Sequence, residues 1–199
     1  MSKKKFSFIK ILCLGILILG IGCIAWSLTN ILTQPKNQFN AEYNASENEA
    51  LDVEVIYEVH PEVGETFGSL TMPTLEQKFS IVQGTSDKEL KMGVGHFVES
   101  ALPGEDNNCV ISGHRDTVFT KVGELQVGDA LIIETSVGIF TYEVTGTKIV
   151  EKDDDTIIVP TDTGKLTLTT CYPFRFLGDA PQRYIVIADL VKKEKPLVK

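Results

Sequence analysis

The stretch KLTLTTCYPF, residues 165–174, decides how the rest of the chain is interpreted. Its residues alternate as in a β-strand, so that Leu166, Leu168 and Thr170 share one face and Thr167, Thr169 and Cys171 share the other. The run then meets Pro173, which lacks the backbone N–H that a strand ladder needs. Cys171 is therefore either a small apolar residue that finishes a core strand or a nucleophile held at a strand tip.

Similar short runs, separated by Gly, Pro, Asn and Asp, occur from about residue 65 onward. Only residues 85–97, TSDKELKMGVGHF, have a helical pattern, and it ends at Gly93 and Gly95. About eight strands in about 130 residues predict an all-β domain, either an antiparallel sandwich or a closed barrel. The predicted strands are TFGSLTMP (66–73), KFSIVQG (78–84), NNCVISGH (107–114), DALIIET (129–135), GIFTYEVTGTKIV (138–150), TIIVPT (156–161), KLTLTTC (165–171) and RYIVIADL (183–190).

Composition limits the classes of function. The chain has 199 residues, of which 43% are hydrophobic and 23% charged, which is typical of one globular domain with additional segments. Its net charge is −8, and without the four lysines of the first ten residues it is near −12. A nucleic-acid-binding protein needs a basic face to neutralise phosphates, so we expect no nucleic-acid partner.

Residues 11–28, ILCLGILILGIGCIAWSL, contain no charged side chain. This length approaches what a helix needs to cross a bilayer, and Trp26 lies near one end, where aromatic rings favour the interface. The lysines precede it, so the positive-inside rule places the N-terminus in the cytoplasm. We therefore predict a single-pass protein of the cell membrane with an extracellular domain. The predicted parts are a cytoplasmic basic tail (1–10), a transmembrane anchor (11–32), a linker (33–64), a β-domain (65–192) and a C-terminal tail (193–199).

Two other exported forms compete with the anchor. A cleavable signal peptide fits less well, because the apolar region is long and CIA before Trp26 is a poor cleavage site. A lipoprotein cysteine at Cys23 fits worse, because apolar sequence continues beyond it. In every case the domain is outside the cell.

Outside the apolar segment the chain has two cysteines, Cys109 and Cys171. They are compatible with one disulfide, or with one buried thiol and one reactive thiol. We interpret Cys109 as a buried structural thiol in the strand that leads to His114.

The three histidines differ in their surroundings. His60 lies beside Pro61 and is expected at the surface, and His96 is expected to have a structural role. His114 follows a β-branched strand broken by Ser112 and Gly113, which places His114 and Arg115 at a strand end.

No HExxH, paired CxxC or carboxylate–histidine spacing predicts a metal site. The acidic loops at 105–106 and 151–155 contain oxygen ligands of the kind that calcium takes, if they fold together. We interpret them as solvated loops, and we expect no required cofactor.

A thiol nucleophile needs an acid or base within reach and a group that stabilises an oxyanion. His114 supplies the first. Arg183 begins the next strand, and if that strand forms a hairpin with 165–171, Arg183 lies near Cys171. Arg175, inside the connecting loop, is the less favoured alternative.

These motifs together resemble the sortases, the membrane-anchored cysteine transpeptidases of Gram-positive bacteria. The similar segments are ISGHRDTVF around His114, LQVGDALII, LTLTTCYPF around Cys171 and QRYIVIADL around Arg183. The resemblance implies a closed eight-stranded β-barrel with short helices and with His114, Cys171 and Arg183 as the catalytic residues. It is greatest to class D. No Asp-Pro-aromatic lid motif, as in pilus-building members, occurs before residue 65, which favours attachment of proteins to the cell wall over polymerisation of pilins. A housekeeping role like that of class A is the remaining alternative.

The resemblance also implies a reaction. Cys171 attacks the Thr carbonyl of an LPxTG-like sorting signal, His114 protonates the leaving amine, and Arg183 stabilises the oxyanion or holds the signal. An amino group of a peptidoglycan precursor then resolves the thioester, so the partners are surface proteins with a C-terminal sorting signal and the cell wall. Thr169, Thr170 and Tyr172 are candidate substrate-binding residues.

Rival functions are less consistent with the motif order. Papain-like and NlpC-type peptidases place the cysteine before the histidine, and an L,D-transpeptidase has a Ser-x-Gly-Cys motif that is missing here. The non-enzymatic alternative is an anchored β-barrel that binds a peptide or wall component, with Cys171 merely packed.

Overall fold

The computed structural model describes residues 20, 22, 57–174, 178 and 180–196. The chain divides into two units, residues 1–45 and 46–199, and the strands lie in the second. No helix among the described residues is long and apolar enough to cross a membrane. The predicted anchor, residues 11–32, lies outside the described residues except for Gly20 and Gly22, which are helical.

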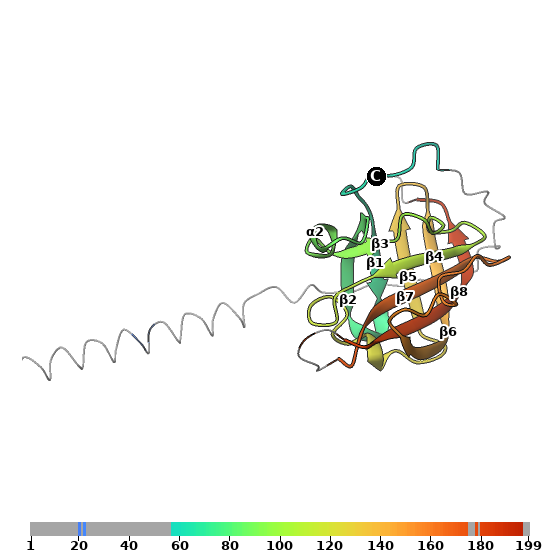
Figure 1. Cartoon of the computed structure of the whole chain (residues 1–199). Coiled ribbons are helices and arrows are strands. Elements are labelled where there is room, and N and C mark those ends of the chain that lie inside the picture. The colour runs from blue at the N-terminus through green and yellow to red at the C-terminus, as the bar shows by residue number, and fades with distance from the viewer. Residues whose placement is uncertain (1–19, 21, 23–56, 175–177, 179, 197–199) are drawn as a thin grey trace, which may run out of the picture. The chain divides into compact units, whose positions relative to one another are not determined.

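Eight strands within the described part of the chain form a closed barrel in the order β1-β2-β3-β4-β7-β8-β6-β5 (Figure 1). This confirms the predicted all-β barrel, and the alternative of an antiparallel sandwich is wrong. The strands are β1 (Thr66–Met72), β2 (Gln77–Gln83), β3 (Val94–His96), β4 (Asn108–Ser112), β5 (Ala130–Thr135), β6 (Ile139–Glu151), β7 (Lys165–Tyr172) and β8 (Gln182–Glu194). The short helices are η1 (Pro73–Leu75), α2 (Asp87–Leu90) and η2 (Val122–Glu124).

Two strand pairs of the barrel are parallel, β2 with β3 and β4 with β7. The β4–β7 pair matters for function, because parallel neighbours bring their C-terminal ends to the same edge. On its other side β7 pairs antiparallel with β8. Apolar side chains from the strands fill the barrel interior, among them Leu166 and Leu168 of β7.

The prediction of a strand at 156–161 is wrong: residues 156–158 form a turn and bends, and residues 159–161 have no regular secondary structure. The Asn108 side chain donates hydrogen bonds to the Ile157 and Val159 carbonyls (3.4 and 3.1 Å), and the Thr161 N–H donates to Asn107 Oδ1 (2.8 Å). Asparagine side chains thus satisfy backbone groups that a neighbouring strand would otherwise pair with.

The helical prediction for 85–97 is correct only for its first turn, α2, because the chain then enters β3. Glycines explain the difference. A Cβ at Gly93 would lie 2.3 Å from the Ser80 carbonyl oxygen, and one at Gly95 would lie 2.4 Å from that of Gly84. These glycines let β3 approach β2 closely, so they mark strand contacts and not a helix end.

The last residues of the predicted linker, from Tyr57 to Gly64, contact the barrel. The Tyr57 hydroxyl donates to the Pro103 carbonyl (2.8 Å), and the Gly64 N–H donates to the Gln83 carbonyl (2.8 Å). Burial of the Tyr57 phenol against the barrel raises its pKa. The last residues before β1 are therefore part of the folded unit.

Candidate active site

Cys171 is the second-last residue of β7, and its side chain is half-buried. The predicted alternation is observed in part: Leu166 and Leu168 belong to the core, and Thr169 and Cys171 line a pocket, which Thr170 from the predicted core face also lines. The strand ends at Tyr172, and the Tyr172–Pro173 peptide bond is cis. Cys171 thus lies at a strand tip beside open space, which is the position a nucleophile requires.

His114 reaches the same edge through the parallel pairing of β4 with β7. Ser112 is the register partner of Thr169, and the Gly113 N–H continues the ladder by donating to the Thr169 carbonyl (3.1 Å). His114 and Cys171 each follow this register pair by two residues, so both lie at the same edge of the barrel, Cys171 within β7 and His114 just beyond β4.

The side chain of Thr170 stabilises the position of the His114 turn relative to β7. Its hydroxyl is buried and donates to the Gly113 carbonyl (2.6 Å), directly before His114. The backbone of the His114 turn is therefore tied to the strand that carries Cys171.

Arg183 is the register partner of Cys171 in the antiparallel pair β7–β8, as the predicted hairpin requires. Its Nη1 donates to the carbonyls of Ala180 (3.2 Å) and Gln182 (3.0 Å). A guanidinium carries five N–H donors in a rigid fork, so these bonds fix its orientation and leave donor capacity for a ligand.

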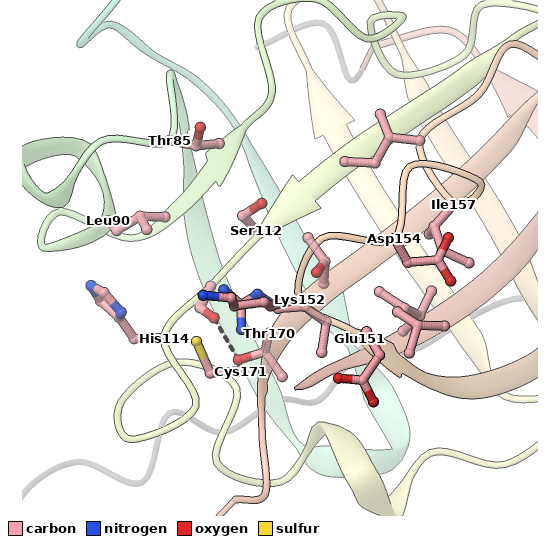
Figure 2. Close-up of a pocket in the computed structure, with 16 residues that line it drawn as sticks. Thr85, Leu90, Ser112, His114, Glu151, Lys152, Asp154, Ile157, Thr170 and Cys171 are labelled. Atoms are coloured by element: carbon pink, nitrogen blue, oxygen red, sulfur yellow. Dashed lines mark hydrogen bonds between the residues drawn. The ribbon is translucent and has the colours of Figure 1, made fainter. Parts of the chain in front are cut away.

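One pocket of about 360 Å³ is lined by all three predicted catalytic residues, His114, Cys171 and Arg183. Figure 2 shows His114 and Cys171 at one end of it and Glu151, Asp154 and Ile157 toward the other. Its other lining residues are Thr85, Leu90, Ser112, Gly113, Val150, Lys152, Ile158, Thr169, Thr170 and Ile185.

The three candidate substrate-binding residues separate in the structure. Thr169 and Thr170 line the pocket, whereas Tyr172 is not among the described lining residues. The ring of Tyr172 packs instead on those of Phe174 and Tyr184, at centroid distances of 5.5 and 6.1 Å. These three aromatic rings support the start of the loop that follows Cys171.

Several lining residues had no signal in the sequence. Lys152, Ile157 and Ile158 lie on the β6–β7 connection, part of which was predicted as a strand. Arg115 is not among the described lining residues of the pocket and was noted only for its strand-end position; it is buried and donates to the Pro173 and Gly178 carbonyls, at 3.1 Å each. Residue spacing predicts neither the place of the β6–β7 connection in the pocket wall nor the hydrogen bonds of Arg115.

His96 and Cys109 are buried inside the barrel domain, as their predicted structural roles require. His96 is fully buried, with Nδ1 2.7 Å from Gln83 Oε1 and Nε2 2.8 Å from the Ala101 carbonyl oxygen, and burial lowers its pKa. Cys109 lies in the core, and burial raises the pKa of its thiol. Cys109 and Cys171 are both free, so they do not form a disulfide.

No group of three or more His, Cys, Asp or Glu side chains is arranged to hold a metal ion within the described part of the chain. The acidic loops have protein partners. Glu105 Oε2 accepts from the Leu102 N–H (2.7 Å), Asp106 contacts Lys193 (3.0 Å), and Asp154 accepts from the Thr156 hydroxyl (2.6 Å).

With this geometry established, comparison with known proteins identifies the family. A sequence model of the sortase domain matches residues 70–191. The chain belongs to the sortase family. It is 49% identical over 127 residues to Sortase D of Bacillus subtilis (strain 168), covering 63% of this chain and 64% of that protein. The chain thus spans slightly less than two thirds of this relative.

Solved sortase structures share the fold. The catalytic domain of B. anthracis SrtD is 42% identical, with a TM-score of 0.60, covering 70% of this chain and 97% of that one. The Clostridium perfringens Sortase D5 transpeptidase is 29% identical, with a TM-score of 0.61, covering 66% of this chain and 82% of that one. Class D sortases are thus found among both its sequence relatives and its structural neighbours.

Proposed function

We propose that this sortase is a membrane-anchored cysteine transpeptidase of class D type. It cleaves an LPxTG-like sorting signal after Thr and transfers the protein to an amino group of the cell wall. The observation that carries the proposal is the single pocket lined by His114, Cys171 and Arg183. A nucleophile, an acid–base group and a permanent cation meet there, which is the set that acyl transfer needs.

In the first step the Cys171 sulfur attacks the carbonyl carbon of the signal's Thr. The amide bond to the next residue breaks, His114 supplies the proton that the leaving amine takes, and a thioester remains on Cys171. Arg183 lies opposite Cys171, where its N–H groups stabilise the charge that develops on the carbonyl oxygen or hold the signal in place.

The chemistry of the pocket wall fits a short peptide with apolar residues before the scissile bond. Leu90, Ile157, Ile158 and Ile185 offer apolar surface for the Leu and Pro of the signal. Thr169 and Thr170 directly precede Cys171 and line the same pocket, so we expect them to contact the residues around the scissile bond.

In the second step an amino group of a peptidoglycan precursor attacks the thioester and regenerates the thiol. The partners are therefore surface proteins with a C-terminal sorting signal and the growing wall. An N-terminal anchor at residues 11–32 would hold the barrel at the outer face of the cell membrane, where both substrates occur.

The test is incubation of the purified full chain with a fluorogenic LPxTG-type peptide and an amine acceptor. We expect cleavage and formation of the amide product, complete loss of both in Cys171→Ala, and a rate about 100- to 1,000-fold lower in Arg183→Ala. Cys109→Ala is the matched control, because it removes a core thiol outside the pocket.

The outcomes separate the proposal from its alternative. Cleavage of the peptide by the Cys171→Ala variant would contradict the mechanism. Binding of the peptide without cleavage by the wild type would favour the non-catalytic barrel that binds a peptide or wall component.

A further inference from the structure

Arg115 is a buried charged residue next to His114, and its side chain binds the loop that follows Cys171. Nη1 donates to the Pro173 carbonyl (3.1 Å) and Nη2 donates to the Gly178 carbonyl (3.1 Å), while Nε lies 3.6 Å from Asp116 Oδ1. Its side chain is only 8% exposed, so its charge is largely removed from water. Charges are rarely buried without fixed partners, so these hydrogen bonds hold the carbonyls of Pro173 and Gly178 in place.

A second guanidinium binds the same loop a short distance along the chain. Arg183 Nη1 donates to the Ala180 carbonyl in the loop (3.2 Å) and to the carbonyl of Gln182, the first residue of β8 (3.0 Å). Gly178, bound by Arg115, is two residues before Ala180. The two arginines therefore bind carbonyls that are only two residues apart in the chain.

The two arginines reach this loop from different strands. Arg115 follows β4, and Arg183 belongs to β8 at the register position of Cys171. The loop backbone thus connects the His114 turn to the cation opposite the thiol. Arginine suits this role, because its planar fork can donate to two carbonyls at once, which the single ammonium of lysine does less well.

We infer that Arg115 is a positioning residue that acts through Arg183. It holds the β7–β8 loop at Gly178 so that the Ala180 carbonyl keeps the Arg183 guanidinium directed into the pocket. This inference rests on the proposed transpeptidase function, because the orientation of the Arg183 side chain affects the rate only if Arg183 takes part in that reaction.

The test is steady-state cleavage of the LPxTG-type peptide by the purified full chain carrying Arg115→Met. We expect kcat/KM to fall about 10- to 100-fold, because misplacing a reacting group by about 1 Å can cost that much. The drop should divide between kcat and KM in the same way as in Arg183→Ala. Lys121→Met is the matched control, because Lys121 is exposed on the same connection between β4 and β5, and we expect no change greater than twofold.

A double-mutant cycle distinguishes positioning from a general loss of stability. In an Arg183→Ala background, Arg115→Met should lower kcat/KM by less than a further twofold, because the group that it orients is already absent. Rates are divided by the concentration of folded protein, which is measured as the Cys171 thiol that reacts with iodoacetamide. A variant that is only less stable would then show a lower melting temperature and an unchanged normalised rate.

Arg115→Lys keeps the charge and serves if Arg115→Met does not fold, and we expect it to recover part of the lost rate. The inference is overturned if the Arg115 variants retain wild-type normalised kinetics, or if their effect multiplies fully with that of Arg183→Ala. A wild-type chain that leaves the peptide uncleaved would instead contradict the proposed function, so the two failures are distinguishable.

Discussion

Cys171 and Arg183 are register partners across the antiparallel pair β7–β8. Partners in such a pair have Cα atoms about 4.5 to 5.5 Å apart, so the thiol and the guanidinium start from adjacent backbone positions. Both side chains line the same pocket. The strand register sets this closeness of the two backbone positions, whereas the direction of the Arg183 guanidinium also depends on the carbonyls that it binds.

The two thiols of the barrel should differ in reactivity. We expect iodoacetamide to modify Cys171 in the folded protein and Cys109 at least about 100-fold more slowly, since Cys109 is buried and burial raises its thiol pKa. Peptide mass spectrometry locates each label, and the two should react alike in denaturant. Labelling of Cys109 before Cys171 would argue against a nucleophilic role for Cys171.

Replacing Thr170 should affect activity more than stability alone explains. Thr170→Val keeps the shape but removes the hydroxyl that donates to the Gly113 carbonyl before His114. We expect a loss of about 1 to 2 kcal/mol in the free energy of unfolding and a cleavage rate about tenfold lower.

Thr167→Val is the matched control for Thr170→Val. The Thr167 hydroxyl is also buried on β7, but it donates to Asn108 Oδ1 (2.8 Å) at the start of β4. A similar loss of stability with an unchanged rate is expected, and equal rate losses in the two variants would contradict the assigned role of Thr170.

Gly113 should not tolerate a side chain. A Cβ there would lie 2.6 Å from the ring of Phe119 and 2.8 Å from Val118 Cγ2, and Phe119 is fully buried. We expect Gly113→Ala to lower the free energy of unfolding by about 1 to 3 kcal/mol and to displace His114 with it. Chemical denaturation measures the first effect and peptide cleavage the second. Gly146→Ala, where a Cβ meets no atom within 4 Å, should leave both unchanged.

Buried His96 should make stability depend on pH. Burial lowers its pKa in the folded state, so below about pH 6.5 the unfolded chain binds a proton that the folded chain does not. Its contribution is thus present above about pH 6.5 and is lost as the pH falls toward the folded-state value. We expect the free energy of unfolding to fall by up to about 1.4 kcal/mol per pH unit more in the wild type than in His96→Gln. Parallel curves for the two proteins would exclude this assignment.

Local patterns predicted most of the strands correctly. Alternation identified β7, and the hairpin that follows it correctly placed Arg183 opposite Cys171. These inferences succeed because they depend on residues close in sequence, whose side-chain faces and turns are set by the local backbone. The errors at 85–97 and 156–161 have a different origin. There, a close approach to β2 and the side chains of Asn107 and Asn108 decided the backbone conformation.

The sequence by itself determined the strand-rich class, the tip position of Cys171 and the cation across the next hairpin. Only the tertiary structure decided which distant segments join them. The parallel pairing of β4 with β7 brings His114 to Cys171, and the barrel brings Lys152 and Ile158 of the β6–β7 connection to the same pocket. Pairings between segments so far apart in the chain follow from closing the whole barrel around its shared core, and no local run of residues encodes that closure.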